Sequence, residues 1–440
     1  MSAAPTTADA PFRPSPPPDG DPAREQRSAF LRLALIVAAA VVASIATGIA
    51  RTMAVIAAIV VIIMLHELGH FATAKWSGMK VTEYFLGFGP RLWSVRRGET
   101  DYGVKAIPAG GYVRIIGMTN LEEVAPQDEA RTYRAATFPR RLLVVSAGSL
   151  VHFLLAIILL WVLLAVVGTP GSQATTTVSS VTVLPGRSPA QVAGLRPGDR
   201  IVALDGRTVQ SWNQVPNVIS SHAGQPVSIT VVRDGRTLVL HAVPRDLVTQ
   251  PIAGVDVSIP RNSQHYGFLG ISPAPVIEHV SPLAAVPQAG SDFGSAVTDV
   301  FGALRQIFSR QGLHTYTSQI TGHVPAPSSG SQPAPRFESV VGIYQLAGDA
   351  ANSGLRDVLV LLIELNVFIG VFNLMPLLPL DGGHVVTAVY ERIRSRRGRP
   401  YHADARKWAP VTAVVVLALV VVAVASTWAD IFHPPANPFQ

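Results

Sequence analysis

The sequence predicts a multi-span α-helical membrane protein with a small membrane-associated β element and an α/β module outside the membrane. Three observations lead to this class. Only 14% of the 440 residues are charged, whereas soluble domains carry about a quarter, and the mean hydropathy is +0.34. Several apolar stretches are long enough to cross a bilayer. Lys and Arg are concentrated in two of the segments between these stretches.

Five stretches are candidates for crossing a hydrocarbon core of about 30 Å, which needs roughly 20 helical residues. Four of them are continuous and apolar: residues 30–50, 53–74, 142–167 and 409–428. The fifth, residues 358–380, is rich in Leu, Val, Ile and Phe but is interrupted by Glu364, Asn366, Asn373, Pro376 and Pro379. Because polar side chains inside a span are costly, we expect this interrupted span to have a functional role.

The distribution of basic residues predicts the orientation. Residues 75–141 contain 11 Lys and Arg, and residues 392–407 contain 7, whereas the long segment 169–354 contains 11 in 186 residues. The positive-inside rule therefore places the first two segments in the cytoplasm and residues 169–354 outside. The net charge of +7 is thus spread by topology and forms no single basic patch, so we predict no nucleic-acid partner.

The N-terminal region is predicted from its composition. Residues 1–28 are rich in Pro and Ala and are expected to be a disordered cytoplasmic tail. Residues 29–50 are expected to be an additional transmembrane span. A cleaved signal peptide is the alternative, although the apolar run is longer than the usual length of about 7–15 residues. In either case the next span starts outside.

Three segments between the spans have recognisable patterns. Residues 80–118 contain short apolar runs separated by glycine turns, which predicts a small β element. Residues 291–310 place apolar side chains at helical spacing, which predicts an amphipathic helix lying on the membrane surface or packed against the neighbouring module. Residues 321–335 form a Pro/Ser/Gly linker.

A candidate metal site lies towards the end of the second span, in the sequence His66-Glu67-Leu68-Gly69-His70. On a helix His66 and His70 share one face, so both imidazoles can reach one ion, and Glu67 is placed to take a proton from a metal-bound water. The alternative is that the three side chains satisfy one another within a helix bundle. Three ionisable groups in an apolar run would be costly without a function, which favours the metal site.

The depth of the motif and the composition limit the choice of a third ligand. Residues 53–65 precede His66 and cover about 20 Å of a roughly 30 Å core, which predicts a site inside the bilayer, nearer the cytoplasm. The chain contains no cysteine, so the ligand must be His, Asp or Glu. The best candidate is Asp381, which follows two prolines and precedes two glycines on irregular backbone at similar depth. The alternative is an Asp-Gly-Gly turn where the chain leaves the membrane.

Together these segments resemble the site-2 protease family of intramembrane zinc metalloproteases, most closely the bacterial branch that cuts membrane-bound anti-sigma factors. The resemblance covers roughly residues 53–428 and rests on His66-Glu67-x-x-His70, Asn373-x-x-Pro376-x-x-Pro379-x-Asp381-Gly382-Gly383, Gly87-Phe88-Gly89-Pro90 and Gly110-Gly111-Tyr112. It divides the chain into a first part of the protease core (53–168), a linker with the amphipathic helix (245–340) and a second part of the core (341–430).

The resemblance implies roles for individual residues. Zinc would be bound by His66, His70 and Asp381, and Glu67 would be the general base. Asn373 would help to hold the substrate backbone or the oxyanion. The β element would receive the substrate as an added strand, with Gly87, Gly89, Gly110 and Gly111 as the residues that contact it.

Two departures from the family pattern are present. The span at residues 29–50 is additional, and Gly148-Ser149-Leu150-Val151-His152 stands where relatives often read Gly-Pro-x-x-Asn. His152 is either a hydrogen-bonded structural replacement, which we favour, or a fourth metal contact that would close the open position. For His384 we likewise favour a structural role over a further metal contact. Glu364 and Asn366 are expected to form interhelical hydrogen bonds.

The segment 178–244 resembles the PDZ domains of bacterial periplasmic proteases. It contains Pro197-Gly198-Asp199, and Asp234-Gly235 joins two apolar runs as a hairpin turn. The alternative is any other small β-rich domain. The resemblance implies that an extended peptide or a trimmed substrate end binds by strand addition.

The sequence therefore predicts an intramembrane zinc metalloprotease of the bacterial plasma membrane, with its PDZ-like domain outside the cytoplasm. The expected substrates are single-span membrane proteins, such as an anti-sigma factor already trimmed by another protease, in regulated intramembrane proteolysis. The alternative function is a non-catalytic membrane adaptor that gathers partners through the PDZ-like domain and uses zinc structurally. A zinc carrier is a third, less favoured hypothesis, because a carrier would need further metal ligands along the route of the ion through the protein.

Overall fold

The computed structural model describes residues 22–182, 187–252, 259, 263–320, 337–395 and 401–432. The chain forms two compact units. Unit 1 comprises Met1–His152 and Phe372–Leu417, and unit 2 comprises Phe153–Val371 and Ala418–Gln440. Residues 1–21 of the predicted tail and the predicted linker at 321–335 lie outside the described residues.

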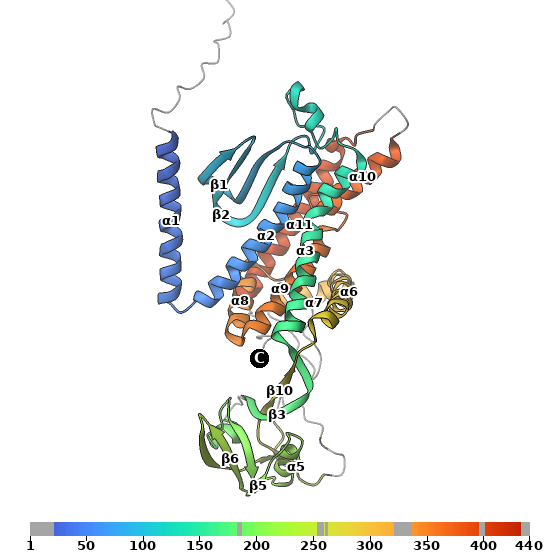
Figure 1. Cartoon of the computed structure of the whole chain (residues 1–440). Helices are drawn as coiled ribbons and strands as arrows, with labels where there is room; N and C mark the ends of the chain where they lie inside the picture. The colour runs from blue at the N-terminus through green and yellow to red at the C-terminus, as the bar shows by residue number, and fades with distance from the viewer. Residues whose placement is uncertain are drawn as a thin grey trace, which may run out of the picture. The chain divides into compact units, whose positions relative to one another are not determined.

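Unit 1 combines helices and a small sheet from the N-terminal part of the chain with two helices from its C-terminal part (Figure 1). Its elements are α1 (Pro22–Ala46), α2 (Ala50–Trp76), β1 (Val81–Arg97), β2 (Thr100–Ile115), a 3-10 helix (Pro126–Arg131), α3 (Phe138–Val162), α10 (Asp381–Arg394) and α11 (Ala405–Phe432). Helices α3 and α11 start in unit 1 and end in unit 2. The first helix begins before the predicted start of the span, because the polar residues that precede residue 29 include good helix formers.

The β element consists of two long strands that bend, so that their pairing produces four short segments. Residues 81–86 pair with 111–115 on one side and with 101–104 on the other, and residues 91–97 pair with 100–105. The edges of this sheet are therefore 111–115 and 91–97. Gly87 and Gly89 allow the bend in β1, since their φ angles of 85° and 82° are ones that L residues rarely adopt.

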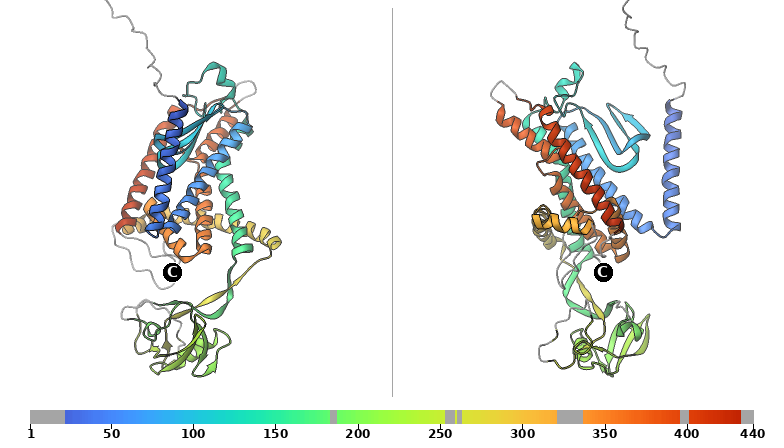
Figure 2. Two further views of the ribbon diagram at one scale, coloured as in Figure 1. Left: turned by 60° about the vertical axis from the view of Figure 1, so that its left-hand side comes forward. Right: turned by 180° about the vertical axis from the view of Figure 1, so that it is seen from behind.

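Helix α1 covers one edge of the sheet. The Gln26 side chain donates from Nε2 to the Ser94 carbonyl at 2.9 Å, and the ring centroids of Phe30 and Trp93 are 5.9 Å apart. The sheet consequently lies between α1 and α2 (Figure 1; Figure 2, right). On the α2 side, the Tyr84 hydroxyl donates to the Met64 carbonyl at 2.8 Å.

An apolar core and ion pairs fix the sheet to the helices of unit 1. The core joins α2, both strands and α3 through the buried residues Ala74, Met79, Val81, Ile115, Tyr133, Val144 and Val145. At the surface, Glu99 accepts from Lys75 at 2.6 Å and from Arg131 at 2.7 Å. The Arg131 guanidinium, together with Lys75, lowers the pKa of Glu99 to about 2.

Unit 2 contains a sheet-rich module in which a sheet has the strand order β10-β3-β4-β6-β7, with β5 beside β4. The elements are β3 (Thr169–Val181), α4 (Pro189–Val192), β4 (Arg200–Leu204), β5 (Arg207–Thr208), α5 (Gln214–Ser221), β6 (Val227–Arg233), β7 (Arg236–Ala242), β8 (Arg245–Asp246), β9 (Gly267–Phe268) and β10 (Ile271–Glu278). The β6–β7 hairpin forms where the Asp234-Gly235 turn predicts it, with positive φ at both turn residues.

The module is larger than the predicted segment 178–244. Strand β3 begins at Thr169, and β10 returns from a distant part of the chain to pair with it, so residues 271–278 belong to the sheet and not to a linker. The sequence did not predict this strand because it contains Pro273 and Pro275, and proline has no backbone N–H to donate to a neighbouring strand. Proline is tolerated here because β10 is an edge strand.

The rest of unit 2 is helical. It comprises the last turns of α3, a π-helix (Leu163–Val167), α6 (Pro282–Ile307), α7 (Arg310–Ile320), α8 (Val340–Ser353), most of α9 (Leu355–Asn373) and the end of α11. The amphipathic segment predicted at 291–310 is mostly α6, which starts nine residues earlier and is drawn as a long yellow helix in Figure 2. Its exposed apolar side chains include Leu283, Val286 and Phe301.

Four of the described helices are long and apolar enough to cross a membrane: Gln26–Ala46, Ala50–Trp76, Phe138–Val167 and Ala405–Phe432. They correspond to the four continuous spans predicted from the sequence. The interrupted fifth span is not among them, since α9 carries Arg356, Asp357 and Glu364. It forms a helix up to Asn373 and an irregular segment from 374 to 380.

Candidate metal centre

Helix α2 places two imidazoles side by side. His66 and His70 are one turn apart on the same face, and each is only 8% exposed. Their Nε2 atoms lie 3.2 Å apart, and the ring planes are nearly perpendicular, at 77°. Two nitrogen atoms therefore converge on one point in a helix that is otherwise apolar.

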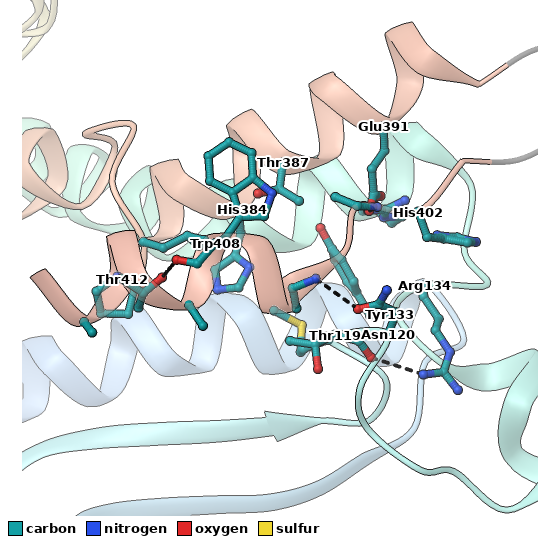
Figure 3. A pocket seen from close by; sticks show the side chains of 18 of the residues that line it. Thr119, Asn120, Tyr133, Arg134, His384, Thr387, Glu391, His402, Trp408 and Thr412 are labelled. Atoms are coloured by element: carbon teal, nitrogen blue, oxygen red, sulfur yellow. Dashed lines mark hydrogen bonds and ion pairs between the residues drawn. The ribbon is translucent and has the colours of Figure 1, made fainter. Parts of the chain in front are cut away.

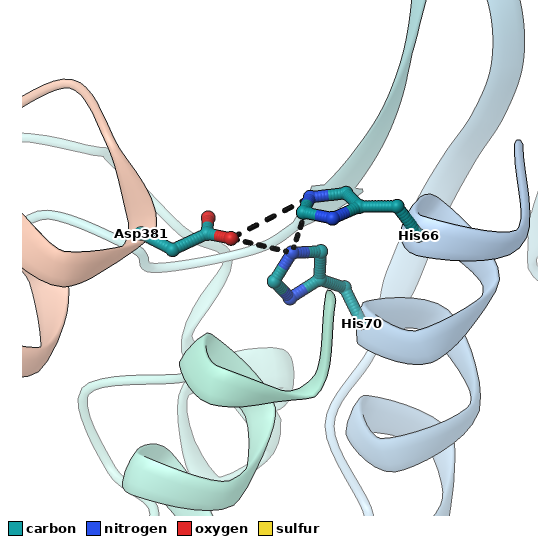
Figure 4. Close-up of side chains that lie close together, drawn as sticks. All are labelled: His66, His70 and Asp381. Atoms are coloured by element: carbon teal, nitrogen blue, oxygen red, sulfur yellow. Dashed lines mark hydrogen bonds and ion pairs between the residues drawn. The ribbon is translucent and has the colours of Figure 1, made fainter. Parts of the chain in front are cut away.

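Asp381 approaches the same point from a distant part of the sequence. It is the first residue of α10, and its Oδ2 atom lies 3.3 Å from His70 Nε2 and 3.5 Å from His66 Nε2 (Figure 4). Among the described residues, His66, His70 and Asp381 form the group of side chains whose ligand atoms are close enough to hold a metal ion. The structure thus brings together the three residues that the sequence singles out as ligands.

The spacing of these three atoms fits a tetrahedral ion. Ligands at about 2.0–2.1 Å from a tetrahedral centre are separated from one another by about 3.3–3.4 Å. The observed separations are 3.2, 3.3 and 3.5 Å. Asp381 Oδ2 is also buried and makes no hydrogen bond of good geometry with a described residue. Three protein ligands would leave one position open, as in catalytic zinc sites.

The segment before α10 folds tightly because of two glycines. A Cβ atom on Gly382 would lie 2.2 Å from the Leu374 carbonyl oxygen, and one on Gly383 would lie 2.6 Å from the Leu378 nitrogen. Both contacts are too short for any side chain. Gly382 and Gly383 therefore allow the irregular segment to fold back on the start of α10, which holds Asp381 in place.

Helix α3 supports the imidazoles from the other side. His70 Nδ1 lies 2.7 Å from the Val144 carbonyl oxygen, and since a carbonyl only accepts, Nδ1 must carry the proton. Nε2 of His70 is then free to bind a metal. A Cβ atom on Gly148 would lie 2.3 Å from His66 Cε1 and 2.4 Å from His70 Nε2, so this glycine makes room for both rings.

The Glu67 side chain extends from α2 towards the sheet. A Cβ atom on Gly111 would be 3.0 Å from Glu67 Cγ and 2.9 Å from Met64 Sδ, which shows how closely β2 approaches the helix. The Glu67 carboxylate lies next to the backbone N–H of Val113. The edge segment 111–115 of the sheet therefore runs directly beside the residue predicted to be the base.

The other predicted substrate contacts occupy varied positions. Gly87 and Gly89 form the bend of β1, and Gly110, with φ of 145°, faces the Phe88 ring. Of the four glycines predicted to contact substrate, Gly111 is the one packed against Glu67. Asn373 is the half-buried last residue of α9.

A cavity of about 500 Å³ lies between α10, α11 and the segments on either side of the 3-10 helix (Figure 3). His384 lines it together with Trp408 and Thr412, so His384 faces this cavity and is not in the metal-ligand group. Its wall also contains a buried ion pair between Arg141 and Glu391. No sequence pattern predicts this pair, because its members are 250 positions apart.

Comparisons with known proteins agree with this geometry. The profile of peptidase family M50 matches residues 54–421. The zinc metalloprotease Rip1 of Mycolicibacterium smegmatis is 33% identical over 404 residues, which cover 86% of this chain and 96% of that protein. Rip1 of Mycobacterium tuberculosis is 32% identical with the same coverage. The zinc metalloprotease RasP of Shouchella clausii is 26% identical and covers 86% of this chain and 98% of its own length.

Proposed function

The chain belongs to peptidase family M50, the site-2 protease family, and we propose that it hydrolyses a peptide bond within or near the transmembrane helix of a single-span substrate. It is a zinc metalloendopeptidase, as its family membership and its similarity to Rip1 and RasP indicate. One observation carries the proposal for an intramembrane reaction. The His66, His70 and Asp381 ligand atoms converge within 3.5 Å at a helix that is long and apolar enough to cross a membrane.

The ligand atoms we assign are His66 Nε2, His70 Nε2 and Asp381 Oδ2, which converge with tetrahedral separations. A bound zinc ion supplies Lewis acidity, which makes water nucleophilic near neutral pH and polarises the scissile carbonyl. Glu67, one residue from the first ligand, accepts the proton of the attacking water and passes it to the leaving nitrogen. The segment at Gly111 keeps this carboxylate close to the sheet.

The substrate must be unwound before it is cut, because a helix hides its carbonyls in hydrogen bonds. We assign this task to the edge segment 111–115 of the β1–β2 sheet, which would pair with the substrate as an added strand. Two contacts support this assignment. Gly111 lies against Glu67, and the opposite edge is covered by α1 through Gln26. A strand added at 111–115 would thus pass the base.

We further propose that the substrates are single-span proteins such as anti-sigma factors, already trimmed by another protease. The sheet-rich module of unit 2 would act as a PDZ-like domain outside the cytoplasm of a bacterial plasma membrane and would bind the trimmed end. The distribution of Lys and Arg along the chain supports this location. The position of β10 at the edge of the sheet supports peptide binding, because an edge strand can accept another strand.

The test is a Glu67→Gln variant of the full chain, assayed with a single-span substrate in proteoliposomes. The amide keeps the size of the carboxylate but cannot accept the proton. We expect zinc content equal to that of the wild type and a turnover at least about 100-fold lower. Cleavage by the variant at the wild-type rate would show that Glu67 is not the base. A variant that retains zinc but has lost cleavage also excludes a non-catalytic adaptor, provided that the wild type cuts.

A further inference from the structure

Helix α3 presents one face to the two histidine ligands. Val144, Gly148 and His152 are four residues apart along the helix and therefore lie on the same side. The Val144 carbonyl accepts the hydrogen bond from His70 Nδ1, and Gly148 leaves the space that both rings occupy. His152 is the third member of this row, and its contact is with the other imidazole.

The ring of His152 packs against the ring of His66. The two ring centroids are 5.0 Å apart, the planes are inclined by 43°, and His152 is only 1% exposed. The His66 ring also contacts the His70 ring, at 4.8 Å between centroids. The His66 ring thus contacts two imidazoles, one from α2 and one from α3.

The two proposed ligands are held in different ways. His70 is oriented by the hydrogen bond from its Nδ1 atom to Val144. His66 Nδ1 is buried and makes no hydrogen bond of good geometry with a described residue, although the Gly148 backbone lies close to the ring. Metal-binding histidines are usually oriented by a hydrogen bond at the second ring nitrogen. The Gly148 backbone therefore orients the His66 ring less firmly than the Val144 carbonyl orients His70, and a ring contact can supply the rest.

We propose that His152 is the positioning residue for His66. Its ring packs on the His66 ring and keeps Nε2 directed at His70 Nε2 and Asp381 Oδ2, which is the task that the Val144 carbonyl performs for His70. His152 does not itself bind the metal, since it is outside the group of converging ligand atoms. The fourth position at the ion thus stays open for the reaction.

This inference rests on the proposed metal centre but not on the proposed substrate. It is tested by zinc affinity, measured by competition with a chelator on the purified full chain in detergent. We expect His152→Ala to bind zinc about 10- to 100-fold more weakly than the wild type, the usual effect of losing a group that supports a ligand. His152→Phe keeps a ring of similar shape and should stay within about threefold of the wild type.

The matched control is Val145→Ala, which removes buried packing from the same helix without touching the imidazoles. It should lower the melting temperature of the metal-free protein and leave zinc affinity unchanged. The absorption spectrum of the cobalt-substituted protein reports the coordination number, and we expect identical tetrahedral bands for the wild type and His152→Phe.

Three results would overturn the inference. His152→Ala could bind zinc as tightly as the wild type, His152→Phe could be as weak as His152→Ala, or the cobalt bands of His152→Phe could show the loss of a ligand. A wild-type protein that binds no zinc would instead contradict the metal centre itself, so the two failures are distinguishable.

Discussion

At the scale of single residues, the metal centre depends on glycines, which leave space for other groups, as much as on the ligand side chains. Gly148 leaves room for both imidazoles, Gly111 lets the sheet approach Glu67, and Gly382 lets the chain fold back before α10. The spacing of His66 and His70 was predictable because four residues are one helical turn. The need for Gly148 was not, because it arises only where α3 packs on α2.

Gly148→Ala is therefore expected to disrupt the centre. Its Cβ atom would lie 2.3 Å from His66 Cε1 and 2.4 Å from His70 Nε2, so the rings must move away from their common point. A misplacement of this size is expected to reduce proteolysis about 100-fold and to lower the zinc content of the purified protein. Metal analysis and a cleavage assay measure the two effects.

The control is Gly290→Ala, another glycine within a helix, whose Cβ atom would meet nothing within 4 Å. It should leave zinc content and cleavage unchanged. If Gly148→Ala also had wild-type zinc content and wild-type cleavage, the close packing of α3 on the imidazoles would not be needed for function.

At the scale of elements, sequence patterns predicted what local chemistry controls. The prolines at 376 and 379 predicted irregular backbone, and α9 does end at Asn373 before an irregular segment. Long-range pairing was not predictable. Nothing in the sequence indicated that β10 returns to β3, or that the edge at residues 91–97 is covered by α1, because both depend on segments far apart in the chain.

The contact of α1 with the sheet predicts a specific cross-link. The chain has no natural cysteine, so Phe30→Cys combined with Trp93→Cys gives one reactive pair, at positions whose rings are 5.9 Å apart. A short bifunctional thiol reagent should join them in membranes, and protease cleavage between the two sites followed by electrophoresis reports the link.

Ile45→Cys with Trp93→Cys is the matched control, because Ile45 is exposed near the other end of α1. It should give no link. Equal yields from both pairs, or loss of the N-terminal helix from the mature protein, would be incompatible with α1 as a retained cover of the sheet edge.

At the scale of the whole molecule, the distribution of charge predicts how the chain is oriented in the membrane. The predicted orientation places the loops of unit 1 in the cytoplasm and the sheet-rich module outside, and this follows from charge alone. The four apolar helices are those that the sequence predicted as continuous spans. The interrupted span is not apolar enough to be counted with these helices, because it contains charged residues such as Glu364.

The orientation can be tested with single cysteines. Val192 is 72% exposed in the module, and Leu121 is 49% exposed in the segment between β2 and α3. A membrane-impermeant maleimide should label Val192→Cys in intact spheroplasts and should label Leu121→Cys only after lysis. The reverse pattern would invert the topology and place the module in the cytoplasm.

The proposed function depends on a zinc centre built from His66, His70 and Asp381, beside a helix that is long and apolar enough to cross a membrane. Zinc-edge X-ray absorption of the purified full chain tests it most directly. We predict about one zinc per chain, with two imidazoles and a carboxylate oxygen at about 2.0–2.1 Å, and loss of one imidazole signal in His70→Ala. A spectrum without imidazole ligands, from protein that still cleaves its substrate, would show that His66 and His70 do not bind the catalytic zinc.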